Sequence, residues 1–394
     1  MEINLFAPES FRAGHPHDQY HWLRENAPVF WQQTADGEGY WALTRYRDVF
    51  AVDRDFSTFS SEPTVMIADP DPAGDMLFGG RKMMLMMDPP QHTLLRRLVR
   101  TTFTREAALT RAPRLDQLAR QILGKVAPSG ACDFVEDIAG EMPSYVIAEL
   151  MGLPPEDGRQ LYRLTEILHS ASPPSEIVAA LSAMFEYGRE VIKQKRAHPG
   201  EDIASALLSA ELDGRKLDDA EFLLFFLLLI DAGGDTTRNL LGAGLVALLE
   251  NPDQLEWLKA DLEGRLGSAR EELLRYCAPV VYMRRRATKD TRIGDTEIRA
   301  GQKVVMYFGA ANRDPSEFEA PDRLDLSRTP NGHIAFGTGP HGCLGQHLAR
   351  LEIDAVLRHL FATLDDIEIT APPQWLSSNF IAGPKTLPIR FRAR

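Results

Sequence analysis

One cysteine, Cys343, lies near the end of a glycine-rich stretch that reads FGTGPHGCLG, residues 336–345. The next segment, Gln346 to Leu360, has the pattern of a helix, so a thiolate at Cys343 would lie near the positive end of the helix dipole. The glycines leave room for a large flat group to approach the backbone. These features predict a cysteine that binds a metal centre. An ordinary turn before a helix is the alternative.

A second group of reactive residue types lies within a long apolar segment, Leu217 to Glu250, whose pattern predicts one buried helix. Its middle reads AGGDT, residues 232–236. A glycine within a helix costs ~1 kcal/mol relative to alanine, and a buried carboxylate is costly unless it is paired. A packing notch for a crossing helix would explain the glycines but not Asp235 and Thr236. The Thr236 hydroxyl could bond back to the carbonyl of Ala232, which would bend the helix.

Together these stretches closely resemble motifs of the cytochrome P450 family. Residues 336–345, called the cysteine loop from here on, are similar to the family's haem-ligand loop. The sequence AGGDT is similar to its oxygen-activation motif, and ELLR at residues 272–275 is similar to its E-x-x-R motif. The resemblance runs from about Asp88 to the C-terminus, with Gly342 as a soft departure because relatives often carry a bulkier residue there. It implies a mainly α fold with a minor β region, a long central helix that crosses the haem, and Cys343 as the iron ligand of haem b.

The resemblance also implies roles for individual side chains. Gly233 and Gly234 would open the helix above the cofactor so that O2 fits, Thr236 would hydrogen-bond the oxygen molecule, and Asp235 would relay protons from solvent. The other contacts to the cofactor would come from donors to its propionates and from the cysteine loop, namely His92, Arg96, Arg285, His341, Phe336 and Gly345.

Two of these contacts depend on local register. Asp88 followed by two prolines is typical of a helix start with Asp88 as its cap, and a helix would place His92 and Arg96 on the same side. Arg285 has an arginine on each side, at 284 and 286, so its assignment could be displaced by one residue. In a strand, however, these neighbours would point to the opposite face.

Two further sets of residues are predicted with the resemblance as the guide. A buried charge network would brace the cysteine loop and would consist of Glu272, Arg275 and Arg323. His333 would be a structural residue at the start of that loop. The substrate pocket would be apolar and would include Met84, Met86, Leu229, Ile230, Val281, Tyr282 and Phe380.

Composition limits the class of protein. The chain has 394 residues and a net charge of −12, which argues against general nucleic-acid binding. Its three cysteines, at 132, 277 and 343, have no paired spacing and favour a reducing cytoplasm. The N-terminus resembles neither a signal peptide nor a membrane anchor, and the longest apolar run, Phe222 to Ile230, is shorter than the ~20 residues that a membrane span needs. We expect one domain over residues 1–394, with a β-containing part at about 1–60 and 280–310 that includes strands near Val29–Gln33 and Tyr40–Thr44.

The resemblance implies a monooxygenase that inserts one atom of O2 into a hydrophobic small molecule such as a terpenoid, steroid, fatty acid or aromatic. The chain has no flavin or iron–sulfur motif, so the electrons would come from a separate acidic ferredoxin and its reductase. The ferredoxin would dock on a basic patch near the cysteine loop, made of Arg97, Arg100, Arg105 and Arg350, although these could be ordinary solvated helix faces.

Three other functions remain open on the sequence. A peroxide-driven peroxygenase of the same fold usually lacks an acid–alcohol pair such as Asp235 and Thr236. A haem sensor would leave that pair without a purpose. A cysteine hydrolase using Cys343 and His341 would need proton transfer between residues that one position separates within a turn.

Overall fold

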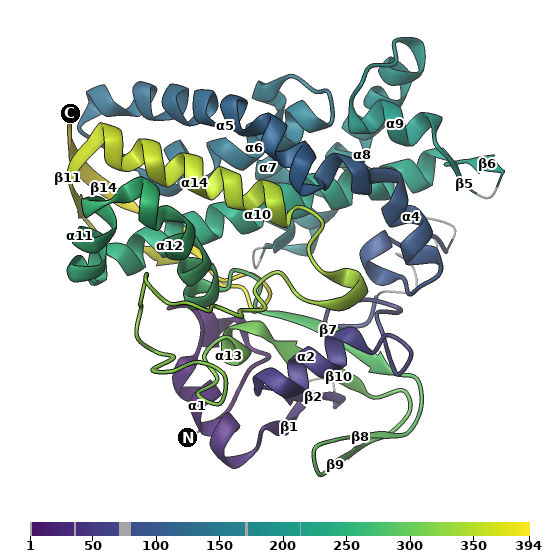
Figure 1. Cartoon of the computed structure of the whole chain (residues 1–394). Helices are drawn as coiled ribbons and strands as arrows, with labels where there is room; N and C mark the ends of the chain where they lie inside the picture. Colours follow the sequence, from purple (N-terminus) through teal and green to yellow (C-terminus); the bar gives the residue numbers. More distant parts are fainter. Residues whose placement is uncertain (1, 35–36, 71–79, 170–171, 213) are drawn as a thin grey trace.

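The computed structural model describes residues 2–34, 37–70, 80–169, 172–212 and 214–394. Helices form a broad layer over a smaller β-containing part, and the segment that leads into the last long helix runs between the two (Figure 1). This architecture agrees with the predicted mainly α fold with a minor β region. The cysteine loop therefore lies where helical layer and sheet meet.

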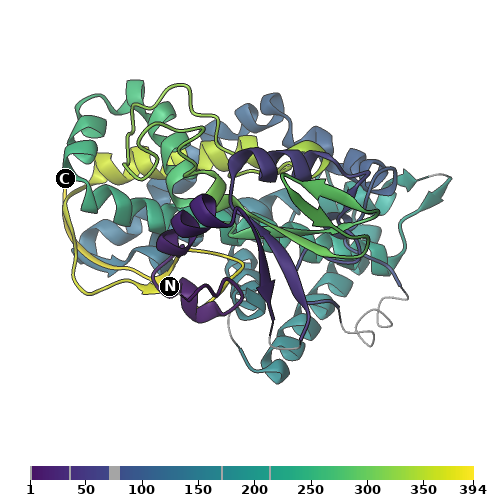
Figure 2. The ribbon, with the colours of Figure 1, turned by 90° about the horizontal axis from the view of Figure 1, so that it is seen from below.

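The main sheet has five strands in the order β1-β2-β10-β7-β3, and strands from residues 29–60 lie beside strands from residues 282–307 in it (Figure 2). Only β2 and β10 pair in parallel; the other neighbours are antiparallel. The predicted strands near Val29 and Tyr40 are confirmed, the second shifted by one residue. The bounds are β1 Val29–Gln33, β2 Gly39–Leu43, β3 Phe59–Ser60, β7 Tyr282–Ala287 and β10 Lys303–Tyr307.

One long helix, α10 (Asp219–Glu250), forms the centre of the helical layer. It begins two residues after the predicted Leu217 because Asp218 caps it: the Asp218 carboxylate accepts a hydrogen bond from the backbone N–H of Glu221, and the Glu221 carboxylate accepts one from the N–H of Asp218. Its apolar residues are buried nearly all round, as the pattern predicted. The helix is therefore a core element rather than a surface one.

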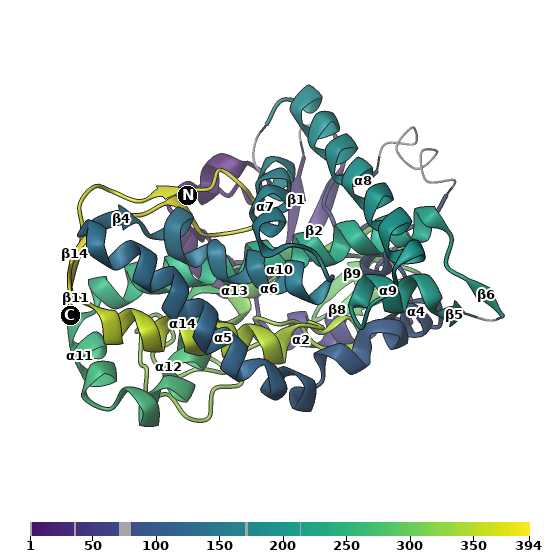
Figure 3. The ribbon, with the colours of Figure 1, turned by 90° about the horizontal axis from the view of Figure 1, so that it is seen from above.

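The remaining long helices surround α10. Two of them, α5 and α14, run along each other, and α6 and α7 pack on α10 (Figures 1 and 3). These helices bury one large apolar cluster. Their bounds are α5 Arg105–Val126, α6 Glu141–Leu150, α7 Pro155–His169, α8 Pro174–Ala197, α12 Leu262–Cys277 and α14 Gln346–Thr363.

Shorter elements complete the fold. The short helices are α1 His17–Asn26, α2 Tyr46–Arg54, α4 Gln91–Arg100, α9 Ile203–Ser209, α11 Pro252–Ala260 and α13 Phe308–Ala311. The strands outside the main sheet are β4 Ala131–Asp133, β5 Glu211–Leu212, β6 Arg215–Lys216, β8 Thr291–Ile293, β9 Thr296–Ile298, β11 Leu364–Ile369, β12 Gln374–Trp375, β13 Pro384–Thr386 and β14 Pro388–Ala393. Among the described residues, none of the helices has the length and apolarity required to cross a bilayer.

The start of α4 differs from its prediction. The helix begins at Gln91 with Pro90 as its cap residue, and no side chain caps it. The Asp88 carboxylate instead accepts hydrogen bonds from the Ser60 hydroxyl and, at 2.8 Å, from the backbone N–H of Ser61. Asp88 therefore connects the end of β3 to the segment that precedes α4. The predicted Asp88 cap is wrong, but His92 and Arg96 do lie on one helix.

Candidate active site

A single cavity brings most of the predicted site residues together. Its lining includes three residues of the cysteine loop (Phe336, Cys343 and Gly345), one face of α10, and residues of α4, α6 and β7. Four predicted polar residues also line it: His92, Arg96, Arg285 and His341. The tertiary fold thus joins segments from between residues 53 and 353 of the chain into one site.

The cysteine loop is held by its own backbone. Gly337 and Gly339 have φ values of +66° and +61°, a region that residues with a Cβ rarely adopt. The backbone N–H of Cys343 donates a 2.7 Å hydrogen bond to the carbonyl of Phe336. Burial raises the pKa of the Cys343 thiol, whereas the backbone N–H groups of Gly345 and Gln346 favour the thiolate. A metal cation at the sulfur would remove the burial penalty, because a coordinating thiol is deprotonated.

At one end of the cavity, four hydrogen-bond donors converge, and the one carboxylate beside them, that of Asp53, pairs with Arg285. The rings of His92 and His341 lie 4.1 Å apart between centroids, and the Nδ1 atom of each is buried with no hydrogen-bond partner among the described residues. Burial, together with nearby guanidinium groups, lowers the pKa of His92 to about 4 and that of His341 to about 2. With Arg96 and Arg285 in the same lining, these donors suit the carboxylates of a haem.

The Arg285 side chain points to the face of β7 that strand alternation predicts. Arg285 lines the cavity, whereas Arg284 and Arg286 face Asp69, with ion pairs of 2.6 and 3.3 Å. Arg285 is itself paired with Asp53 at 2.7 Å. Asp53 could not be identified from the sequence, because no motif lies near it in α2.

Arg96 has a second contact that was not expected. Its Nη2 donates a 2.6 Å hydrogen bond to the carbonyl of Gly342 in the cysteine loop. Burial lowers the pKa of Arg96, and the negative charge of a Cys343 thiolate opposes that shift. Arg96 therefore connects α4 to the backbone next to the predicted iron ligand.

One face of α10 lines the cavity, and its members recur with the period of a helix. They are Leu229, Ala232, Gly233, Thr236, Thr237 and Leu240, together with Leu228. The Thr236 hydroxyl lies 3.4 Å from the carbonyl oxygen of Ala232, which confirms the predicted hydrogen bond within the helix. Thr236 is therefore placed to contact a molecule in the cavity.

Asp235 precedes Thr236 on α10 but lies outside the cavity lining. Its carboxylate is 3.5 Å from Nη1 of Arg238, and both side chains are buried. Arg238 also reaches Glu166 of α7, at 3.3 Å, and its guanidinium lies 4.8 Å from the centroid of the Tyr162 ring. Burial lowers the pKa of Arg238 to about 10. These contacts connect Asp235 to a partly exposed carboxylate at the surface.

The two glycines of α10 serve helix packing. A Cβ on Gly233 would lie 3.0 Å from the Ile147 side chain of α6, and one on Gly234 would lie 3.3 Å from Tyr162 of α7. Gly233 also lines the cavity, but Gly234 does not. The packing notch weighed from the sequence therefore accounts for both glycines, and the predicted opening above the cofactor is wrong for Gly234.

The apolar wall of the cavity was predicted only in part. Met84 and Leu229 line it, but the prediction is wrong for the remaining five residues. Ile230 lies one helix position off the lining face, and Met283, not Tyr282, shares the strand face of Arg285. Val281, Tyr282 and Phe380 belong to a separate apolar cluster, and Met86 lies outside the lining. The wall also contains residues that the sequence did not identify: Leu85, Phe103, Pro143, Val146, Ile147, Leu150 and Met283.

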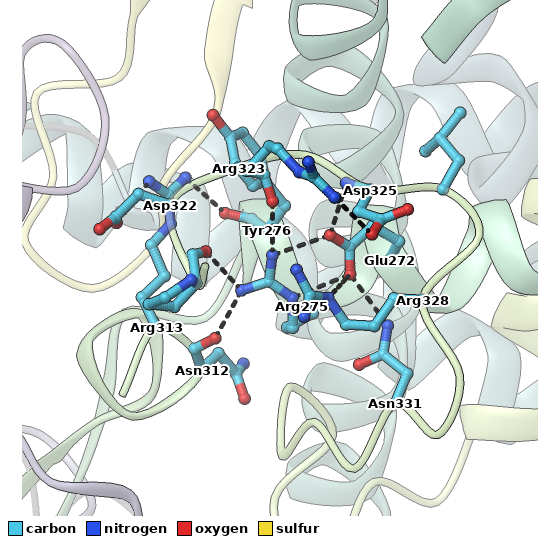
Figure 4. A network of polar contacts seen from close by, with 12 residues as sticks. Glu272, Arg275, Tyr276, Asn312, Arg313, Asp322, Arg323, Asp325, Arg328 and Asn331 are labelled. Carbon is cyan, nitrogen blue, oxygen red and sulfur yellow. Dashed lines mark hydrogen bonds and ion pairs between the residues drawn. The ribbon is translucent and has the colours of Figure 1, made fainter. Parts of the chain in front are cut away.

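The predicted charge network is present, but one of its three side chains differs from the prediction (Figure 4). Glu272 and Arg275 form a fully buried ion pair at 2.8 Å. The third side chain is Arg328, whose Nε lies 3.1 Å from Glu272. The prediction of Arg323 is wrong for its side chain, which is 70% exposed and pairs with Asp325. Arg323 contributes its backbone carbonyl, which accepts a 3.3 Å hydrogen bond from Arg275.

His333 has the structural position that was predicted. Its Nε2 lies 3.1 Å from Glu271, and its Nδ1 accepts a 3.3 Å hydrogen bond from the N–H of Ala335. Glu271 also binds Arg350 at 2.8 Å, and the Arg350 guanidinium lies 4.5 Å from the centroid of the Phe336 ring. Arg350 is therefore part of the support of the cysteine loop.

Comparison with known proteins identifies the class. The family described as Cytochrome P450 matches residues 162–373. A methyl-branched lipid omega-hydroxylase of Mycobacterium tuberculosis is 36% identical, over 93% of this chain and 89% of the relative. A steroid C26-monooxygenase of Mycolicibacterium smegmatis is 34% identical, over 99% and 96%. The solved structure of Mycobacterium marinum cytochrome P450 CYP268A2 in complex with pseudoionone has a TM-score of 0.93, 34% identity and 99% coverage of both chains.

The chain therefore belongs to the cytochrome P450 family and is a cytochrome P450 monooxygenase. The family implies a haem-thiolate cofactor. The site fits that cofactor in two respects: the Cys343 thiol lies at one wall of the cavity, and at one end of it the buried Nδ1 atoms of His92 and His341 have no hydrogen-bond partner among the described residues.

Proposed function

We propose that this monooxygenase hydroxylates a large, uncharged, mainly aliphatic lipid, such as a steroid, a terpenoid or a methyl-branched chain. The observation that carries the proposal is the wall of the cavity. Away from the donors that suit the propionates, it consists mostly of aliphatic, methionine and phenylalanine side chains from α6, α10 and the segment before α4. Such a wall binds apolar surface and offers little to a charged group. The names of the lipid and steroid hydroxylases above support the same class.

Within this site, Cys343 would ligate the haem iron, and His92, Arg96, Arg285 and His341 would contact the propionates. Bound haem with a thiolate ligand supplies the activation of O2 that hydroxylation requires. Phe336 and Gly345 line the cavity beside the cysteine, and a Cβ on Gly345 would have no neighbour within 4 Å. Gly345 thus leaves space where a flat ring has to lie close to the backbone.

Protons would reach the site through α10. Thr236 lines the cavity, and the adjacent residue Asp235 holds a buried carboxylate just outside the lining. We propose that Asp235 exchanges protons with the surface through the neighbourhood of Glu166 and passes them toward Thr236. For this purpose, Asp235 has to leave Arg238 in part of the cycle.

The electron donor would be an acidic ferredoxin that docks beside α4. Arg97, Arg100 and Arg105 are exposed there, and none of them makes an ion pair within the described part of the chain. The neighbouring Arg96 touches the cysteine loop, so this surface is close to the predicted iron ligand. Arg350 is a weaker candidate than the sequence suggested, because Glu271 already neutralises it and only 23% of its side chain is exposed.

The three cysteines are free among the described residues, which supports a reducing compartment such as the cytoplasm.

Turnover with isotopically labelled O2 tests the proposed function. The protein would be supplied with a ferredoxin, its reductase and one of three compounds: cholesterol-type steroid, acyclic terpenoid or methyl-branched fatty alcohol. We expect a hydroxylated product that carries one labelled atom. Turnover with peroxide that exceeds turnover with the reductase system would instead identify a peroxygenase. Activity restricted to charged, unbranched fatty acids would contradict the proposed substrate class.

A further inference from the structure

One buried carboxylate, that of Asp53, touches two parts of the site that are distant in sequence. Asp53 lies in the last turn of α2, and its side chain is only 3% exposed. Its Oδ1 is 2.7 Å from Nη2 of Arg285 on β7. Its Oδ2 accepts hydrogen bonds from the backbone N–H and the hydroxyl of Thr338, at 2.6 and 3.1 Å. The two oxygens of Asp53 are thus divided between the Arg285 side chain and the cysteine loop.

The cysteine loop also packs directly on the end of α2. A Cβ on Gly339 would lie 2.9 Å from the backbone oxygen of Asp53 and 3.0 Å from the Cα of Arg54. A Cβ on Gly337 would lie 3.3 Å from the Asp53 carboxylate. Both glycines have positive φ, so a side chain at either position would strain the backbone and would also crowd the end of α2. The cysteine loop therefore packs on the C-terminal end of α2.

The charge of Asp53 is matched to its surroundings. Burial lowers the pKa of Arg285, and the negative charges of Asp53 and Asp88 oppose that shift. A buried guanidinium without a partner would be costly. The bond from the Thr338 N–H to a carboxylate is charge-assisted, so it is stronger than the same bond to a neutral acceptor. Removal of the charge alone should weaken both contacts.

We propose that Asp53 is a positioning residue that couples the propionate-binding Arg285 to the cysteine loop and so fixes the axial thiolate relative to the haem. This inference rests on the proposed haem contacts of Arg285 and Cys343. Asp53 also lines the cavity, and it acts on the cofactor by holding these two neighbours in place. A single change at α2 should therefore affect both haem retention and the integrity of the thiolate ligand.

Asp53→Asn tests the coupling, because asparagine keeps the size and one acceptor but loses the charge. Two quantities are measured on the haem-loaded protein: the rate of haem transfer to apomyoglobin, and the rate at which the ferrous–CO complex loses the long-wavelength Soret band of thiolate ligation. We expect both rates to rise about tenfold. Asp48→Asn is the matched control, since Asp48 lies buried in the same helix but pairs with Arg47 and does not line the cavity. It should leave both rates unchanged.

Two further variants separate the two contacts. Arg285→Lys should accelerate haem transfer, and adding Asp53→Asn to it should still accelerate loss of the thiolate band through Thr338. Thr338→Val keeps the backbone N–H but removes the hydroxyl contact to Asp53, so it should accelerate loss of the thiolate band about twofold. This variant keeps the proposal testable if Asp53→Asn does not fold. Unchanged rates in Asp53→Asn, or faster haem transfer with a normal thiolate band, would overturn the coupling. A wild-type protein that shows no haem spectrum would instead refute the proposed function.

Discussion

At the residue scale, the site depends on Arg285, which lines the cavity from β7 and pairs with the buried Asp53 of α2 at 2.7 Å. Strand alternation placed Arg285 in the cavity and its neighbours on the opposite face. The same alternation could have identified Met283, which shares the face of Arg285. Asp53 could not be found in this way, because its partners lie 232 and 285 residues further along the chain. Long-range polar contacts of this kind leave no local pattern.

The position of Asp235 leads to a prediction about proton delivery. Asp235→Asn should lower the rate of turnover by about 10²-fold and leave the binding of substrate to the ferric protein unchanged, because residue 235 does not line the cavity. The kinetic solvent isotope effect should rise, which a merely structural role would not produce. Asp219→Asn, at the exposed start of the same helix, is the control. Normal turnover in Asp235→Asn would exclude the carboxylate from proton transfer.

At the element scale, the helices α10 and α14 and the strands β1 and β2 were predicted to within a few residues, but irregular segments could not be predicted. The stretch between α13 and the cysteine loop illustrates this limit. Its arginines look alike in sequence, and only the folded path brings Arg328 rather than Arg323 to Glu272 (Figure 4). Likewise, the apolar residues of α6 look like ordinary core until the crossing with α10 places them in the cavity wall.

This pair of arginines provides a matched stability test. Arg328→Ala removes one partner of a fully buried carboxylate and should lower the free energy of unfolding by about 1–3 kcal/mol. Arg323→Ala removes an exposed side chain and should change it by less than about 0.5 kcal/mol. Denaturant unfolding of both variants measures the difference. Equal losses would show that the irregular segment is arranged differently.

Helix α14 carries a buried carboxyl that predicts a pH dependence. Burial raises the pKa of Glu352 from 4.5 to about 8, and its Oε2 has no hydrogen-bond partner among the described residues. Between these two pH values the folded state holds one more proton than the unfolded state. The contribution of Glu352 to stability therefore falls as pH rises, by up to about 1.4 kcal/mol per unit, and levels off above pH 8.

Glu352→Gln should remove this dependence. The stability of the variant relative to wild type should increase from pH 5 to 8, as measured by denaturant unfolding at several pH values. Glu256→Gln, an exposed site on α11, should show no such trend. A difference between Glu352→Gln and wild type that is independent of pH would contradict an uncharged Glu352 in the folded protein.

At the scale of the whole molecule, the family and its fold followed from two short motifs, because their residue types make sense only around one cofactor. That the chain forms one domain stays a prediction. The chain has a net charge of −12 and yet a local basic surface at α4, because a net charge does not show how the charges are distributed. The substrate also depends on the shape of a wall built from five or more segments, so the sequence limits it only to an apolar class.

The basic surface at α4 predicts how electron transfer responds to charge. The double variant R97E/R100E should lower kcat/KM for an acidic ferredoxin about tenfold or more at low salt, and the loss should shrink at high salt. R12E, which reverses an exposed arginine near the N-terminus, is the control. Equal effects of the two reversals would place the docking site elsewhere.

The ferrous–CO spectrum of the haem-loaded protein tests the central claim most directly. The account predicts the long-wavelength Soret band of thiolate ligation in the wild-type protein and its loss in Cys343→Ser, with Cys132→Ser unchanged. A wild-type protein that lacks this band after expression with ample haem, or a Cys343→Ser variant that retains it, would contradict Cys343 as the axial ligand.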